Sequence, residues 1–192
     1  MKRILVFIII FLNTISNISA EDIKRITVGN VDAKITIIAF ESLTCSHCAN
    51  FHKDVYPQLK KEYLDTGLAK IEFRHFPLDI AAFNASKVSQ CKNDGDSIIL
   101  NSLFANQQKW VKGNSVEEAN KYLQKFLVNE GFSVDFEKCI ENKEIEDFVL
   151  NDRIDGVKKY KVNATPTIII NDEKFEKSLN YKNLKKALEK LI

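Results

Sequence analysis

The stretch that decides the fold is Ile35-Thr36-Ile37-Ile38-Ala39-Phe40, which is followed after a short loop by Cys45-Ser46-His47-Cys48. The nearly continuous apolar run predicts a buried strand over 34–41, and the pattern becomes helical from Ser46 to about Tyr63. The two cysteines therefore stand at a strand-to-helix junction, three positions apart. Thiols at this spacing can form and break a disulfide with each other, which indicates electron exchange with other thiols.

A second feature lies far downstream. Thr165-Pro166 stands directly before another apolar strand, Thr167–Ile170. A strand over 69–76 lies between the two sites, and a final helix is predicted from about Tyr181. This order of elements predicts an α/β thioredoxin fold with an inserted α-helical subdomain.

The helical subdomain is predicted over approximately 79–161, where strand patterns are scarce and proline is absent. We expect four or five helices there, separated near 93–95, 112–114 and 130–131. Pro57 predicts a kink near Lys53 or a break before Pro57 in the helix that begins at Ser46. Short strands are also predicted over 23–28 and 174–176.

The first twenty residues have the pattern of a cleavable export signal. Lys2 and Arg3 precede an apolar run over 4–12 that is too short to span a bilayer, and Ala20 offers a small residue for cleavage. We expect 1–20 to be removed, leaving 21–192 as one exported domain. Removal of two basic residues takes the formal charge from +2 to zero, which gives no argument for a nucleic-acid partner.

The chain has four cysteines, and in an oxidising compartment an even count favours disulfides. Proximity pairs Cys45 with Cys48, which leaves Cys91 with Cys139. Because neither Cys91 nor Cys139 has a neighbouring cysteine, we expect a structural bridge and not a second redox pair.

Cys45 is predicted at a helix start, where free backbone N–H groups and the helix dipole favour a negative charge. His47 can add a positive charge or a hydrogen-bond donor. Such surroundings lower the pKa of a cysteine from about 8.5 into the range of roughly 3.5–7.5. Cys48, one turn further, should be buried and act as the resolving thiol. A cis Pro166 would leave the Thr165 backbone free to pair with an incoming peptide.

Two further residues have alternative interpretations. Cys45, Cys48 and His52 form a C-x2-C-x3-H cluster that could bind zinc or copper. No fourth ligand is evident, so we expect neither a metal nor another cofactor, and an exported metal-binding protein is the less favoured function. Glu41 is either a proton acceptor for Cys48 or a solvated or salt-bridged surface carboxylate, and the second interpretation is favoured.

The residues over 40–52, 57–63 and 73–79, together with Thr165-Pro166-Thr167, resemble the DsbA family of periplasmic thiol:disulfide oxidoreductases, which implies that this protein acts in the periplasm. The resemblance implies that Cys45 is the nucleophile, Cys48 the resolving cysteine, His47 the stabiliser of the thiolate and Thr165-Pro166 the cis-proline loop that meets the substrate. It also implies that the protein donates disulfides to reduced, unfolded exported proteins and is reoxidised by a quinone-coupled membrane protein of the DsbB type.

Ser46 and Thr165 differ from the residues that many oxidases of this family carry, so a periplasmic disulfide isomerase or reductase is the alternative function. Related isomerases associate through an additional N-terminal segment. The stretch between Ala20 and the first strand is too short for one, so we expect a monomeric oxidase.

Overall fold

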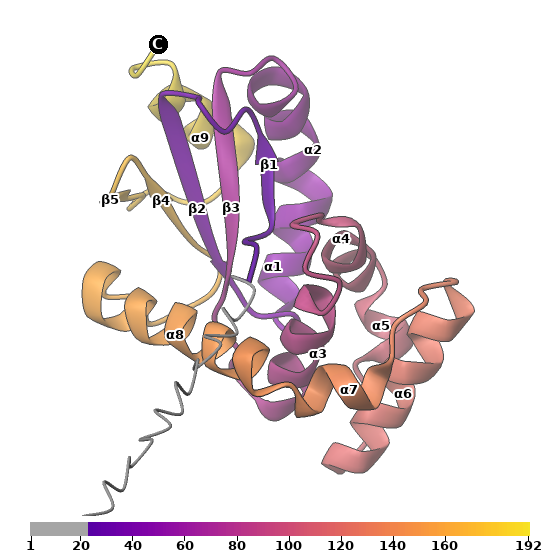
Figure 1. The fold of residues 1–192 in the computed structure, drawn as a ribbon. Coiled ribbons are helices and arrows are strands. Elements are labelled where there is room, and N and C mark those ends of the chain that lie inside the picture. The colour runs from indigo at the N-terminus through magenta and orange to yellow at the C-terminus, as the bar shows by residue number, and fades with distance from the viewer. Residues whose placement is uncertain (1–22) are drawn as a thin grey trace, which may run out of the picture.

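The computed structural model describes residues 23–192, so the predicted export signal at 1–20 lies outside the described residues. Within them, one mixed sheet has the strand order β1-β3-β2-β4-β5 (Figure 1). β2 and β3 pair in parallel at its centre, and the other neighbours pair antiparallel. The strands are β1 (Thr27–Gly29), β2 (Ile35–Glu41), β3 (Ala69–His75), β4 (Thr167–Ile170) and β5 (Glu173–Lys174).

A long helical segment follows β2 and carries both cysteines of the motif. It consists of α1 (Ser46–Asn50), a π-helical turn η1 (Phe51–Val55), α2 (Tyr56–Leu59) and a second π-helical turn η2 (Lys60–Leu64). The later helices are α3 (Ile80–Gln90), α4 (Ile98–Ala105), α5 (Gln107–Trp110), α6 (Val116–Asn129), α7 (Phe136–Glu141), α8 (Lys143–Tyr160) and α9 (Tyr181–Leu188). None of the helices within residues 23–192 is long and apolar enough to cross a membrane.

The alternation of β2 separates two apolar layers. Ile35, Ile37 and Ala39 face the larger core, which also contains residues of the long helical segment, α3, α4, α6 and α9. Ile38 and Phe40 face the smaller core, where Tyr160 at the end of α8 covers them. Gly156 allows α8 to lie this close, because a Cβ there would lie 3.0 Å from the ring of Phe40. The sheet is therefore covered on both faces, as the predicted thioredoxin fold requires.

Of the two effects predicted for Pro57, the break before it does not occur, and the irregularity lies around Lys53, the other predicted position. Helical turns run without interruption over 46–64, and the irregularity appears as the π-helical turn at Phe51–Val55. There the backbone N–H of Tyr56 donates to the carbonyl of Phe51, five residues earlier. A wider turn directly before the proline lets the chain continue where a regular α-helix would meet a clash and lose a hydrogen bond.

Three further predictions need correction. Six helices, not four or five, lie between β3 and β4 in the described chain, because the short helix α5 and the division at Asn142 between α7 and α8 left no clear pattern. β1 begins only at Thr27, since the backbone of Lys24 hydrogen-bonds the side chains of Gln90 and Asn93. β5 covers Glu173–Lys174 and not 174–176, because the turn at 171–172 sets the register with β4 one residue earlier.

Candidate active site

A tightly held loop delivers Cys45 from β2 to the helix. Cys45 is the N-cap residue of α1, with an extended backbone, and its N–H donates to the Ser42 carbonyl at 3.0 Å. Thr44 donates its hydroxyl to Asp79 at 2.7 Å. Gln107 of α5 donates its amide N–H₂ to the carbonyl oxygens of Leu43 (2.8 Å) and Cys45 (3.0 Å). The loop is thus fixed from the helical region as well as from the sheet.

The Cys45 thiol is partly exposed and lies among hydrogen-bond donors. Its pKa is lowered from 9.0 to about 5, chiefly because the Cys48 thiol donates a hydrogen bond to it. The Thr165 side chain and the backbone N–H groups of Cys48 and His47 lower it further, while partial burial opposes them. The free N–H groups of a first helical turn favour a thiolate at this position, as the sequence predicts.

The Cys48 thiol has the opposite surroundings. The residue has no exposed surface, and burial is the main cause that raises its pKa. Its hydrogen bond to Cys45 and the nearby charge of Glu41 raise the pKa further. Two thiols three positions apart therefore differ strongly in acidity: one forms a thiolate readily, and the other holds its proton.

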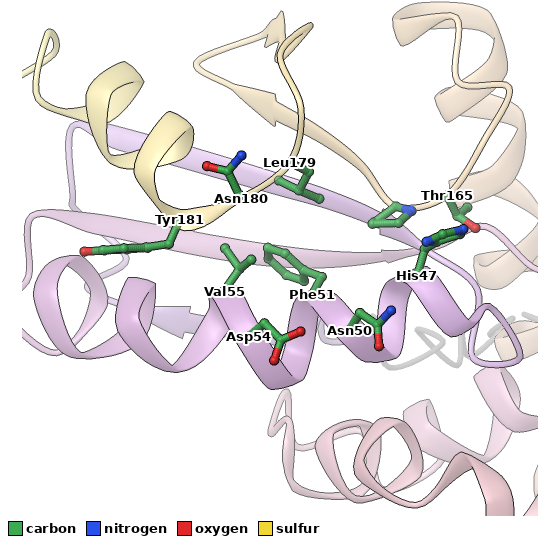
Figure 2. Close-up of a pocket in the computed structure, with 10 residues that line it drawn as sticks. His47, Asn50, Phe51, Asp54, Val55, Thr165, Leu179, Asn180 and Tyr181 are labelled. Carbon is green, nitrogen blue, oxygen red and sulfur yellow. The ribbon is translucent and has the colours of Figure 1, made fainter.

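The chain from the far end of the sequence completes the site. The Thr165–Pro166 peptide bond is cis, and the carbonyl oxygen of Thr165 lies 3.4 Å from the Cys45 sulfur. His47 is exposed on the first turn of α1, and its ring lies near Thr165 (Figure 2). The structure thus brings Cys45, Cys48, His47 and the Thr165-Pro166 loop together.

A groove runs away from this site between the long helical segment and the chain before α9 (Figure 2). Its volume is about 530 Å³. Phe51, Val55, Pro166 and Leu179 give it an apolar floor, and its polar lining residues are His47, Asn50, Asp54, Thr165, Asn180 and Tyr181. We call it the client groove, after the role proposed below, in which a client is a protein that receives a disulfide.

Glu41 is not at the surface, as the favoured interpretation of a solvated or salt-bridged surface carboxylate requires, although it does have a pairing partner. The residue is 4% exposed, and its Oε2 lies 2.9 Å from Nε2 of His52, whose side chain is also buried. Burial raises the pKa of the Glu41 carboxyl against the attraction of His52. The error came from strand phase. Glu41 follows Ile37 and Ala39 at a spacing of two, so it lies on the same face of the sheet and faces the helix that carries the cysteines.

Cys91 and Cys139 form a disulfide that joins the end of α3 to α7. Neither residue belongs to the site around Cys45.

Gln107, by contrast, contacts that site directly and was missed, because a glutamine in a short helix carries no signal that would link it to a loop more than sixty residues away. His52, the third member of the disfavoured metal cluster, has its ring bonded to Glu41. Across residues 23–192, no three His, Cys, Asp or Glu side chains are grouped so as to hold a metal ion.

A family profile and the sequences of known proteins both indicate the same family. A family profile described as Thioredoxin matches residues 21–190. A Rickettsia bellii relative, provisionally named a protein-disulfide oxidoreductase, is 27% identical over 178 residues, covering 89% of this chain and 66% of that protein. The chain spans 62% to 66% of the length of three Rickettsia relatives. Disulfide bond formation protein D of Bacillus subtilis is 28% identical over 175 residues, covering 84% of this chain and 74% of that protein.

Solved structures agree. The crystal structure of α-DsbA1 from Wolbachia pipientis has a TM-score of 0.75 at 30% identity and covers 87% of this chain and 90% of that one. Oxidised BdbD from Bacillus subtilis has a TM-score of 0.70 at 26% identity, covering 86% of this chain and 91% of that one. With the profile match over almost the whole described chain and the close structural likeness at 30% identity, the chain belongs to the thioredoxin family and, within it, to the DsbA-like proteins.

Proposed function

We propose that the protein is a thiol:disulfide oxidoreductase that introduces disulfide bonds into exported proteins through a mixed disulfide at Cys45. The observation that carries the proposal is the contrast between the two thiols. Cys45 is partly exposed and has a pKa lowered to about 5 by its hydrogen bonds, whereas Cys48 is buried and its pKa is raised by that burial. The names of the relatives support the same chemistry.

In the proposed reaction, a client thiolate attacks Cys45 in the Cys45–Cys48 disulfide. The bond between the two cysteines breaks, a client–Cys45 disulfide forms, and Cys48 leaves with the electron pair. A second client thiolate then attacks the client sulfur of this mixed disulfide, and Cys45 leaves as a thiolate. The hydrogen bonds around Cys45 make it a good leaving group, so they favour transfer of the disulfide to the client.

The Thr165-Pro166 loop and the client groove are the proposed contact with the client. Proline has no backbone N–H, and the carbonyl of Thr165 lies beside the Cys45 sulfur. An extended client segment that pairs with the backbone here would place its own sulfur against Cys45. We assign to His47 the role of stabilising the thiolate, and to the Cys91–Cys139 disulfide a structural role.

The export and the partners follow from the same proposal. We infer that residues 1–20 are a cleaved signal, that the mature protein acts as a monomer in the periplasm, and that the clients are reduced, unfolded exported proteins. Reoxidation requires a disulfide-carrying oxidant, for which we propose a quinone-coupled membrane protein of the DsbB type. The helical insertion is proposed to lie approximately over 79–161.

The experiment that tests the function is the reduction potential of the Cys45–Cys48 pair, measured by equilibrating the protein in graded glutathione buffers. We expect a potential above that of the glutathione pool, together with fast oxidation of a reduced, unfolded client. A potential similar to that of thioredoxin would instead identify a reductase or isomerase. For this two-electron couple, about 30 mV corresponds to about 1.4 kcal/mol, so the two outcomes are well separated.

A further inference from the structure

A second cavity lies between the long helical segment and α4, and the proposed exchange chemistry does not use it. Its volume is about 510 Å³, and its lining residues come from α1, η1, α2, η2, α4 and α5. Exposed Lys53 and Gln108 stand among them, so the cavity opens at the surface. It shares only Asn50 with the client groove, so we treat it as a separate site and call it the α4 cavity.

Aromatic rings form one wall of the α4 cavity. His52 stacks on Phe104 with ring centroids 4.1 Å apart, and the Tyr56 ring lies 5.3 Å from that of His52. Phe104 and Tyr56 are buried, and His52 is held by its hydrogen bond to Glu41 at 2.9 Å. The other apolar lining residues are Ala49, Pro57 and Ala105. A cavity of this volume with fixed aromatic and apolar walls suits a flat aromatic ring.

The charge of the α4 cavity favours an anion. Lys53 and Lys60 line it, and among the described residues that do so none is an aspartate or a glutamate. The client groove, in contrast, is lined by Asp54. Lys60 is already paired with Asp65, whereas the exposed Lys53 has no ion-pair partner in the described part of the chain. An anionic group at the mouth of the cavity would therefore meet Lys53 without displacing an existing partner.

Two buried polar atoms of lining residues lack hydrogen-bond partners. The Tyr56 hydroxyl and the Asn101 Oδ1 atom have none within residues 23–192, since Asn101 donates its amide N–H₂ to Ser97 at 3.0 Å. Burial raises the pKa of Tyr56 to about 12 although Ser97 and Asn101 act to lower it, which places both near its hydroxyl. Because unpaired buried polar atoms are costly, a ligand hydroxyl that accepts from Tyr56 and donates to Asn101 would be favoured.

We propose that the α4 cavity binds a small hydroxylated aromatic carboxylate. The aromatic ring lies against the wall formed by Tyr56 and Phe104, the carboxylate meets Lys53 at the mouth, and the hydroxyl at the opposite end of the ring reaches Tyr56 and Asn101. The inference goes beyond the proposed function, because the cavity is separate from the client groove and binding there requires no redox chemistry.

The test is a titration of the oxidised protein with 6-hydroxynaphthalene-2-carboxylate, whose own fluorescence reports binding. Two analogues separate the contacts: naphthalene-2-carboxylate lacks the hydroxyl, and 6-hydroxynaphthalene-2-carboxamide lacks the charge. Lys53→Gln removes the assigned cation. Lys61→Gln is its matched control, because Lys61 is an exposed lysine of the same helical segment that does not line the cavity.

Two further variants test the cavity itself. Ala105→Trp places a large ring at an exposed lining position and should fill the space. Tyr56→Phe keeps the ring and removes only a hydroxyl that has no partner, so the variant should fold as well as the parent. Circular dichroism and a cooperative denaturation curve establish folding. Gln108→Trp, at another exposed lining position, replaces Ala105→Trp if that variant does not fold.

We expect the parent to bind the hydroxylated carboxylate with a Kd below about 1 mM, and Ala105→Trp to lose saturable binding. Lys53→Gln should weaken binding of both carboxylates about two- to fivefold, as for an exposed ion pair, and leave the carboxamide unchanged. The hydroxyl should improve binding several-fold in the parent and give no improvement in Tyr56→Phe. Lys61→Gln should match the parent.

Absence of saturable binding by the parent up to about 10 mM would overturn the proposal. Binding that survives both tryptophan variants would place the probe elsewhere and overturn it as well. Equal weakening by Lys53→Gln and Lys61→Gln would remove the role assigned to Lys53, and a hydroxyl advantage that persists in Tyr56→Phe would remove the buried contact. The proposed function fails by a different measurement, the reduction potential, so the two failures are distinguishable.

Discussion

The Cys45 sulfur lies 3.4 Å from the carbonyl oxygen of Thr165, although 120 residues separate them in the sequence. The antiparallel pairing of β2 with β4 produces this proximity, because it places the C-terminal end of β2 beside the N-terminal end of β4. The motif cysteines and the downstream loop are therefore joined by the sheet itself. A client that reacts with Cys45 must meet the Thr165-Pro166 loop at the same time.

The two motif cysteines should give different products when each is replaced by alanine. Cys45→Ala removes the attacked sulfur, so we expect client oxidation to be lost. Cys48→Ala leaves Cys45 without its resolving partner, so client complexes held by a mixed disulfide should accumulate. Non-reducing gel electrophoresis, with and without a thiol added afterwards, measures both. Equal trapping by the two variants would contradict the assignment of Cys45 as the attacked residue.

The stability of the reduced protein should depend on pH in a defined direction. The Cys45 pKa is about 5 in the folded chain, against an ordinary value of 9.0. Between these values the unfolded chain binds more protons, so the free energy of unfolding of the reduced form rises with pH. The gain is fully present above about pH 9 and is lost as the pH falls through about 5.

The oxidised form lacks this titrating thiol and serves as the reference. We expect the free energy of unfolding of the reduced form, measured in urea, to rise relative to that of the oxidised form as the pH rises from about 5 toward about 9. The Cys91–Cys139 disulfide is kept in both forms. The folded chain keeps Cys48 protonated throughout, so that thiol changes the stability only from about pH 9 upward, where the unfolded chain loses its proton. A free energy of unfolding of the reduced form that falls relative to that of the oxidised form as the pH rises would contradict a stabilised thiolate.

The Cys91–Cys139 disulfide should matter for stability and not for exchange. It closes a loop across a sequence separation of 48 residues, and loop-closure entropy assigns such a bridge about 4 kcal/mol, with engineered cases often giving less. Replacing both cysteines by alanine should lower the free energy of unfolding by about 2–4 kcal/mol. Chemical denaturation of variants that also lack Cys45 and Cys48 measures this loss.

The same pair of substitutions in the chain with an intact motif should leave client oxidation near the parent rate. This is the control for a structural role. If these substitutions instead lowered the rate of client oxidation clearly below that of the parent, the Cys91–Cys139 pair would have to take part in exchange.

His47 should contribute to the acidity of Cys45 without dominating it. The backbone N–H of His47 lowers the Cys45 pKa and remains in a His47→Ala variant. Loss of the exposed imidazole should raise the pKa of Cys45 but leave it well below 9.0. A pH titration of the thiolate absorbance measures this, with Ser46→Ala as the exposed neighbour that should leave the pKa unchanged. No difference between the two variants would remove His47 as a thiolate stabiliser.

The fold could be predicted from the sequence because its strong signals are local. The apolar run of β2, the alternation of β3 and the proline before β4 each indicate one element, and their order is diagnostic. The π-helical turn before Pro57 could not be predicted, because it resolves a conflict between a helical pattern and a residue that breaks helices.

The site was predictable to the extent that it is local in sequence. Cys45, Cys48 and His47 lie within one motif, so their chemistry can be worked out from spacing. Glu41 and Gln107 could not be placed, because their roles depend on strand phase and on a contact between distant segments. Sequence periodicity near the end of a strand leaves the phase undetermined.

Gln107 gives the helical region a part in the redox centre that neither the cysteine motif nor the sheet reveals. Its amide donates to two carbonyl groups of the loop that positions Cys45, and it begins a short helix that ends at the buried Trp110. A substitution in α5 or beneath it therefore changes the orientation of the reactive cysteine without altering any residue of the motif. Two relatives with identical cysteine motifs can for this reason differ in reactivity, and the helical region is where the cause should be sought.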